Sequence, residues 1–202
     1  MWSDLIHNSQ SYQRLDYVFR YSSIPVSSKE NVSTHSYWVS VYSLLIHKKL
    51  FLGSERLLIS TLVYALSHDF IEGLTGDIVR VFKYATPELK RAIDDAESLM
   101  EDKLDPSIKE ALFTWDKHLE PQEKNLVKAI VKAADFMSLF TYMRREVLRG
   151  NREVKPFFQI MVKDLLDMSS QPMVELESVK FDQGKFYSSI GVEASNIGEK
   201  YL

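Results

Sequence analysis

Residues 67–77 read SHDFIEGLTGD and directly follow the apolar stretch LLISTLVYAL of residues 57–66. A helix as apolar as 57–66 faces the core, so its polar end must lie in a cleft or find polar partners. Gly73 and Gly76 predict that the helix breaks here and that the chain bends sharply. The stretch therefore predicts a helical core with a cluster of potential ligands at the end of one helix.

Helical patterns recur on both sides of this stretch. Residues 36–50 carry apolar side chains at the i, i+3, i+4 spacing of an amphipathic helix. No β alternation of any length is visible, so we predict an all-α fold of about five to seven helices. The expected end signals are Ser54 and Thr86 as N-caps, Pro87, Pro106 and Pro121 in first turns, and Gly150 as a C-cap.

Two segments lack a clear helical pattern. Residues 21–34, YSSIPVSSKENVST, read as a long loop in which Ser33 or Thr34 caps the following helix. In the last thirty residues, Gly184 and Gly191 suggest a loosely attached tail. We predict a single domain over 1–202, with a catalytic core at about 14–150 and C-terminal helices or tail at 151–202.

Composition narrows the classes of function. The 202 residues can bury one core, and 45% hydrophobic with 26% charged residues is an ordinary globular mix. The net charge of −3 disfavours a nucleic-acid binder. No apolar run approaches the roughly 18 residues of a membrane span, and MWSDLIHNSQ does not read as a signal peptide. We therefore expect a cytoplasmic protein that has no membrane partner. The sequence contains no cysteine, so any metal must be held by histidine and carboxylate.

Four polar residues on three helical segments each need a partner. They are His35, His68, Asp69 and Asp135, the last inside the apolar run AIVKAADFMSLF. A divalent transition metal such as Zn, Co or Mn would satisfy all four and leave positions for water. The alternative is that Asp135 pairs with Lys132 while His68 and Asp69 cap a helix end. The remaining histidines, His7, His47 and His118, are read as surface or satisfied core residues.

The order His35, His68-Asp69, Asp135 on helices resembles the HD-domain metal-dependent phosphohydrolases. The resemblance is closest to the YfbR-like 5′-deoxynucleotidases and to phage dATP triphosphohydrolases of the DatZ kind. It is carried by RYSSIPVSSKENVSTHS, HDFIEGLTGDIVRVFKY and EKNLVKAIVKAADF, and it covers about residues 14–150. It implies an HD-domain helical bundle, a homo-oligomer, and a metal site to which a second ion such as Mg could be added by the substrate phosphates.

The resemblance also implies roles for two carboxylates in the opening stretch. Glu72 lies one helical turn after His68 and corresponds to the family carboxylate that orients or deprotonates the attacking water. Asp77 corresponds to the residue beside that water, and the glycines would let it fold back over the site. The alternatives are that Glu72 is a solvent-facing acid and that Asp77 is the N-cap of the next helix.

Five further residues are candidates for binding substrate. Arg20, Lys83 and Lys132 match positions at which the resembled family contacts phosphate or substrate. Tyr21 stands where the bacterial 5′-deoxynucleotidases carry tryptophan against the sugar, which puts exclusion of ribose in doubt. Ile24, with its serine neighbours, would shape an apolar base pocket.

Three functions remain open. We prefer hydrolysis of dATP, as a deoxynucleoside triphosphate, to deoxynucleoside and triphosphate, because Arg80, Lys83, Lys90 and Arg91 add positive charge after the bend. The enzyme would then work in a host cytoplasm if it is phage-encoded. The first alternative is a 5′-deoxynucleotidase acting on deoxynucleoside monophosphates, and the second is a non-catalytic nucleotide-binding regulatory module. For both enzymes the partner is a small deoxynucleotide, whereas the regulatory module would bind nucleotide or metal.

Overall fold

The structure is a computed structural model that describes residues 13–50, 54–177 and 179–202, apart from the side chains of Arg80 and Val81. The longer helices are α2 (Val32–Leu50), α3 (Glu55–Ser67), α6 (Pro87–Glu101), α8 (Pro121–Leu148), α9 (Lys155–Asp167) and α10 (Gln183–Tyr201). The short elements are α4 (Glu72–Thr75), α5 (Arg80–Lys83), α7 (Pro106–Leu112), η1 (Gln13–Asp16), η2 (Arg152–Val154), η3 (Met168–Ser170), β1 (Val174–Leu176) and β2 (Val179–Phe181). The predicted all-α fold is confirmed, with one two-stranded hairpin added.

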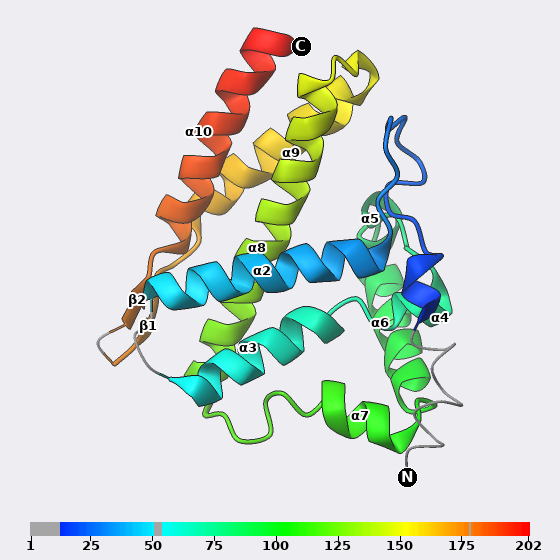
Figure 1. The fold of residues 1–202 in the computed structure, drawn as a ribbon, viewed down its shortest axis with the longest axis vertical. Helices are drawn as coiled ribbons and strands as arrows, with labels where there is room; N and C mark the ends of the chain where they lie inside the picture. The colour runs from blue at the N-terminus through cyan, green and yellow to red at the C-terminus, as the bar shows by residue number, and fades with distance from the viewer. Residues whose placement is uncertain (1–12, 51–53, 178) are drawn as a thin grey trace.

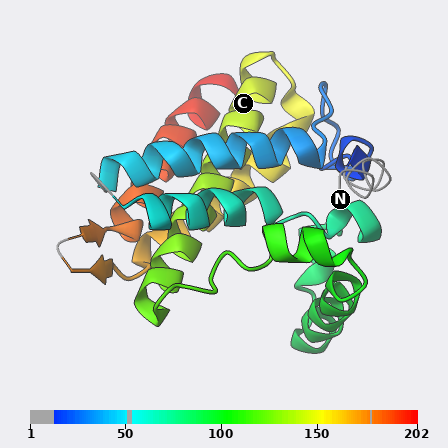
Figure 2. The same cartoon turned by 60° about the horizontal axis from the view of Figure 1, so that its bottom comes forward.

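Helix α8 is the centre of the fold (Figure 1). Helices α2 and α3 pack on one part of it, and α10 packs further along it with α9 alongside. Its buried residues supply a larger share of the core than those of any other described helix, including Leu126, Ile130, Phe136, Met143 and Val147. The segment from α4 to α7 stands to one side of these helices, as the turned view of Figure 2 shows. The chain after α3 therefore leaves the core at the motif quoted above and returns to it with α8.

Most of the expected helix ends are confirmed. Ser54 Oγ accepts a hydrogen bond from the backbone of Leu57, Thr86 Oγ1 accepts one from Leu89, and the three prolines stand in first turns. Gly150 follows α8 with a φ of 84°. The cap of α2 was predicted wrongly: Asn31 Oδ1 accepts from the backbone of Thr34 at 2.9 Å. The helix therefore begins at Val32, four residues before the predicted start.

The expectation of a loose tail is wrong. Strands β1 and β2 pair in an antiparallel sheet, and α10 buries Tyr187, Ile190 and Ala194 against the core. A Cβ on Gly184 would lie 2.4 Å from the carbonyl oxygen of Ser169, and one on Gly191 would lie 3.0 Å from the Leu166 side chain. Both glycines therefore permit close packing of a helix, which a sequence reading cannot distinguish from flexibility.

One helical stretch, Glu55–Thr75, is long and apolar enough to cross a membrane by length and composition alone, which we had not expected. Within the described chain it is two helices, α3 and α4, joined by a turn that carries His68 and Asp69. The absence of a membrane partner remains a prediction.

Candidate active site

Three helices bring the four expected ligands to one point. His35 lies near the start of α2 and Asp135 in the middle of α8, while His68 and Asp69 directly follow α3. His35 Nε2 lies 3.3 Å from Asp135 Oδ1 and 3.5 Å from Asp69 Oδ2. His68 Nε2 lies 3.2 Å from Asp69 Oδ2. Ligand atoms of His35, His68 and Asp135 all lie within 4.8 Å of one another.

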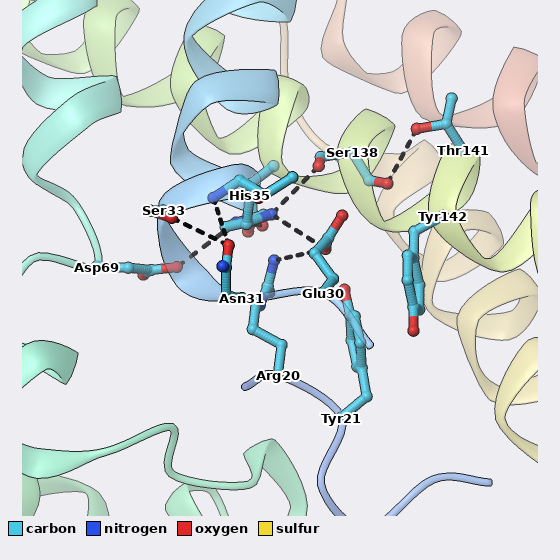
Figure 3. A network of polar contacts seen from close by, with 12 residues as sticks. Arg20, Tyr21, Glu30, Asn31, Ser33, His35, Asp69, Ser138, Thr141 and Tyr142 are labelled. Carbon is cyan, nitrogen blue, oxygen red and sulfur yellow. Dashed lines mark hydrogen bonds and ion pairs between the residues drawn. The ribbon is translucent and has the colours of Figure 1, made fainter. Parts of the chain in front are cut away.

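Each imidazole ring has a polar partner at Nδ1, the nitrogen that is not offered to the metal. His35 Nδ1 lies 3.2 Å from Ser138 Oγ, and His68 Nδ1 lies 2.8 Å from the carbonyl oxygen of Ala65 (Figure 3 shows His35). The opposite nitrogens, both Nε2, are buried and make no hydrogen bond within the described part of the chain. A second-nitrogen partner of this kind is usual for histidines that bind metals.

The donor set fits a divalent transition metal. Two imidazole nitrogens and two carboxylates, with no thiolate, suit Zn, Co or Mn and leave coordination positions for water and phosphate. Among residues 13–50, 54–177 and 179–202, no second group of three such ligands comes together. A second ion carried in by the substrate therefore remains a prediction.

The charges at the cluster also favour a cation. Burial lowers the pKa of His35 to about 4, and the nearby Arg20 guanidinium acts in the same direction, so this ring is neutral at pH 7. For His68, burial by itself would lower the pKa, but the Asp69 carboxylate outweighs it and raises the pKa to about 9. The cluster thus attracts positive charge, which a proton or a metal ion can supply.

The two alternative interpretations of these residues are also present in the structure. Lys132 Nζ lies 2.8 Å from Asp135 Oδ2, and the backbone N–H of His68 caps α3 by bonding to the Tyr64 carbonyl. Neither interaction uses His35 Nε2 or His68 Nε2, so both are compatible with a shared cation.

Glu72 is partly buried beside the cluster rather than facing solvent. Burial, together with the charges of Asp69 and Asp77, raises its pKa to about 8. Its Oε2 is buried and has no hydrogen-bond partner among the described residues. A carboxyl group in this condition can gain or lose a proton near neutral pH, as general acid–base chemistry requires.

Asp77 folds back toward the site, as the glycines predicted. Gly76 has a φ of 77°, and Asp77 Oδ2 accepts a hydrogen bond from the backbone of Tyr21 at 3.2 Å. Burial raises the pKa of the Asp77 carboxyl. Helix α5 begins at Arg80, three residues after Asp77. The described hydrogen bond of Asp77 therefore joins the bend to the loop at Tyr21 and does not cap this helix.

A cavity of about 450 Å³ opens beside the cluster. Asp69, Glu72, Asp77 and Asp135 contribute carboxyl groups to its lining. The lining also includes four residues of α9, the apolar Phe157, Ile160 and Met161 together with Asp164, whose spacing is one face of a helix. This volume suits a small ligand with one polar and one apolar part.

All five predicted substrate-binding residues line this cavity, namely Arg20, Tyr21, Ile24, Lys83 and Lys132. The pKa of Arg20 is raised: burial acts against the charge, but Tyr21, Asp69 and Asp135 outweigh it. The Arg20 guanidinium lies 5.0 Å from the Tyr21 ring, which stacks on Tyr142 at 4.7 Å. Lys83 Nζ is bound by the Glu97 carboxylate at 2.7 Å.

Of the basic residues expected after the bend, Lys83 lines the cavity but Lys90 and Arg91 do not. Lys90 pairs with Asp94, Arg91 lies 3.4 Å from Glu88 at the surface, and neither basic residue lines the cavity. The side chain of Arg80 lies outside the described residues. This removes the argument from Lys90 and Arg91 for binding β- and γ-phosphates.

Sequence reasoning missed the residues that support the site. Ser138 lies three positions after Asp135, which places it on the same face of α8. Tyr142 is seven positions after Asp135, and its hydroxyl donates to the Ser28 carbonyl at 2.7 Å. Helical spacing along α8 could have indicated Ser138 and Tyr142. By contrast, only the fold brings Glu30 and the residues of α9 that line the cavity to the site.

Comparison with known proteins agrees with this geometry. A family model described as 5′-deoxynucleotidase YfbR-like matches residues 7–181. A 5′-deoxynucleotidase of Vibrio cholerae is 30% identical over 152 residues, which are 69% of this chain and 74% of the relative. One from Vibrio vulnificus is 32% identical over 149 residues, with the same two shares.

Solved structures show the same fold. An HD-domain phosphohydrolase from Listeria innocua has a TM-score of 0.62 at 22% identity and covers 81% of this chain and 79% of its own. A protein from Pyrococcus horikoshii has a TM-score of 0.65 at 18% identity and covers 95% and 99%. With the family match over most of its length, the chain belongs to the YfbR-like 5′-deoxynucleotidase family and is an HD-domain phosphohydrolase.

Proposed function

We propose that this enzyme is a 5′-deoxynucleotidase that hydrolyses deoxynucleoside 5′-monophosphates to deoxynucleoside and phosphate. The observation that carries the proposal is the convergence of His35, His68 and Asp135 within 4.8 Å beside a cavity that Asp135 and Arg20 line. The family match and the relatives named 5′-deoxynucleotidase support it. They favour our alternative interpretation over the dATP triphosphohydrolase that we had preferred.

In this proposal His35, His68, Asp69 and Asp135 hold the divalent metal. When bound there, such a cation would polarise a phosphoryl oxygen and lower the pKa of water. Glu72 accepts a proton from the attacking water, for which its raised pKa and its position beside Asp69 suit it. Asp77 orients the same water.

Bond changes at phosphorus follow from this arrangement. The water oxygen forms a bond to phosphorus while the bond from phosphorus to the 5′-oxygen breaks. The leaving 5′-oxygen receives a proton, so the products are a deoxynucleoside and inorganic phosphate. Glu72 is the group placed to return that proton.

The proposed substrate lies along the cavity from the metal cluster to α9. Arg20 and Lys132 line the cavity and would neutralise the phosphate. The carboxylates of Asp69 and Asp135 raise the pKa of Arg20, which keeps its guanidinium charged beside the cluster. Tyr21, stacked on Tyr142, would face the sugar. The apolar wall of Ile24 and α9 would take the base.

A monophosphate fits the charges better than a triphosphate. Beyond Arg20 and Lys132, Lys83 lines the cavity but is already bound by the Glu97 carboxylate, and Lys90 and Arg91 do not line it. A non-catalytic module would not need Glu72 as a buried carboxyl group beside the cluster, so we retain catalysis. A single domain over 1–202, a homo-oligomer and a cytoplasmic location remain predictions.

The test is a screen of all common ribo- and deoxynucleoside mono-, di- and triphosphates with added Mn²⁺, Co²⁺ or Zn²⁺. We expect inorganic phosphate from several deoxynucleoside monophosphates. Triphosphate released from dATP with little turnover of dAMP would overturn the proposal in favour of the triphosphohydrolase. Equal rates on ribonucleotides would show that Tyr21 does not exclude the 2′-hydroxyl.

A further inference from the structure

Glu30 is a buried acid that the proposed reaction leaves without a role. It is 4% exposed and does not line the cavity. Its backbone carbonyl accepts a hydrogen bond from Arg20 N at 2.9 Å, and Val32 N donates to the Val18 carbonyl at 2.9 Å. These bonds close the base of the loop over residues 21–29. They hold Arg20 and Glu30 side by side, although ten positions separate them.

The Glu30 carboxylate lies among three charged or ionisable groups. Its Oε2 is 3.9 Å from Arg20 Nη1 and 4.0 Å from His35 Nδ1, and its Oε1 is 3.8 Å from Arg145 Nη2 (Figure 3 shows the first two partners). A buried carboxylate is costly unless cations compensate it, and a buried guanidinium is likewise held by the acid. Glu30 and Arg20 therefore compensate one another's charge across 3.9 Å, without a hydrogen bond between Glu30 Oε2 and Arg20 Nη1.

The same group of residues forms a closed ring of contacts. Arg20 lies over the Tyr21 ring, Tyr21 stacks on Tyr142, and the Arg145 guanidinium lies 5.6 Å from the Tyr142 ring centre. Glu30 closes the ring because it is the carboxylate that faces both arginines. Removing its charge would leave Arg20 and Arg145 without the carboxylate that lies near both of them.

His35 is held differently from Arg20. Its Nδ1 is closer to Ser138 Oγ, at 3.2 Å, than to Glu30, at 4.0 Å. Ser138 is therefore the direct partner of the imidazole, and Glu30 is a neighbouring charge. Ser138 thus contacts a proposed metal ligand, whereas Glu30 lies beside Arg20, the residue proposed to bind phosphate.

We propose that Glu30 is a positioning residue that fixes the Arg20 guanidinium for the substrate phosphate, while Ser138 fixes the His35 ring for the metal. This inference rests on the proposed function for the identity of the substrate. Glu30 touches neither the reacting atoms nor the cavity, so it acts through Arg20.

The central variant is Glu30→Gln, which keeps the shape and removes the charge. We expect kcat/KM for dAMP to fall by about 10–100-fold, mainly through KM, with a smaller change in metal affinity. Glu30→Asp, which restores the charge, should recover part of the loss. Ser138→Ala should show the opposite split, with weaker metal binding and a KM for dAMP near that of the wild type once metal is saturating.

A matched control tests whether loss of any Glu–Arg pair has the same effect. Glu123 is 8% exposed and pairs with Arg56 at the start of α8, and neither residue lines the 450 Å³ cavity. Glu123→Gln should lower the melting temperature without changing KM or metal affinity. A purely structural role for Glu30 would make the Glu30→Gln variant behave in the same way.

The Arg20→Ala background decides whether Glu30 acts through Arg20. There, Glu30→Gln should change KM by less than about threefold, because the group that it positions is gone. Effects that multiply in the double variant would overturn the inference, as would a Glu30→Gln variant with KM and phosphate affinity within twofold of the wild type.

Binding of inorganic phosphate to the metal-loaded protein, measured by calorimetry, gives a readout that does not depend on turnover. Glu30→Gln should weaken it by the same factor as Arg20→Ala. If the wild type hydrolyses no deoxynucleoside monophosphate, the proposed function fails. The phosphate titration still decides the role of Glu30, and equal affinity in the wild type and Glu30→Gln would overturn it.

Discussion

The backbone amide of Tyr21 donates a hydrogen bond to Oδ2 of Asp77 over 3.2 Å, joining residues 56 positions apart. Tyr21 has a φ of 59°, a conformation that non-glycine residues rarely adopt, and Gly76, next to Asp77, has a φ of 77°. Two bent segments thus meet at this bond. The loop that carries Arg20 and the turn that carries Glu72 therefore face the same cavity.

Replacement of Asp135 by asparagine should remove metal binding and activity together, because the carboxylate charge is lost from the cluster. Elemental analysis and Co²⁺ titration would measure the effect. Asp167→Asn, an exposed aspartate at the end of α9, is the control and should bind metal normally. A fully loaded Asp135→Asn protein would contradict the assignment.

Replacement of Glu72 by glutamine should leave metal binding intact and slow turnover by about 10²–10⁴-fold, as expected for the loss of a general acid–base group. The measurement is kcat at saturating metal, together with metal content. If the variant loses its metal but turns over normally once metal is restored, Glu72 is a ligand instead.

Replacement of Lys132 by alanine should raise KM for dAMP, since a charge-assisted hydrogen bond contributes about 1.5–3 kcal/mol, or about 10–150-fold. Lys90→Ala is the matched control, because Lys90 pairs with Asp94 and does not line the cavity. An increase for dATP far larger than for dAMP would favour the triphosphate interpretation.

Replacement of Asp164 by alanine should alter base preference. Asp164 is the one acidic residue among the four positions of α9 that line the cavity. A carboxylate accepts hydrogen bonds from the amino groups of adenine, cytosine or guanine, which thymine lacks. The ratio of kcat/KM for dAMP to that for dTMP should fall by about tenfold. An unchanged ratio would show that the base does not reach α9.

Replacement of Glu146 by glutamine should destabilise the protein at neutral pH but not in acid. Burial would raise the pKa of Glu146, but hydrogen bonds from Ser27 and Asn151 outweigh it and hold the pKa below its usual range. Its contribution is therefore present above the unfolded pKa of about 4.3 and is lost as the pH falls through the folded pKa. Denaturant unfolding of both proteins between pH 3 and 7 should show the two stabilities converging in acid. A constant difference would contradict the assigned cause.

Local signals explain which predictions succeeded. Proline in a first turn, a capping hydroxyl and apolar periodicity act within a few residues, so the starts of α3, α6, α7 and α8 could be predicted from the sequence. The cap of α2 was missed because Asn31, Ser33 and Thr34 are all capable of the same bond. The glycines of α10 were misread because tight packing and flexibility have the same sequence signature.

The sequence by itself determined the helical class and indicated the candidate metal ligands, since each residue type at its spacing restricts the chemistry available to it. The roles of Glu72 and Asp77 were indicated by the resemblance to a known family. Only the tertiary structure brought His35, His68 and Asp135 within 4.8 Å, paired Lys83 with Glu97, and placed Glu30 between Arg20 and Arg145. The physical reason is range. Capping and periodicity depend on neighbours along the chain, whereas compensation of a buried charge depends on which distant side chains the packing of α2, α3 and α8 brings beside it.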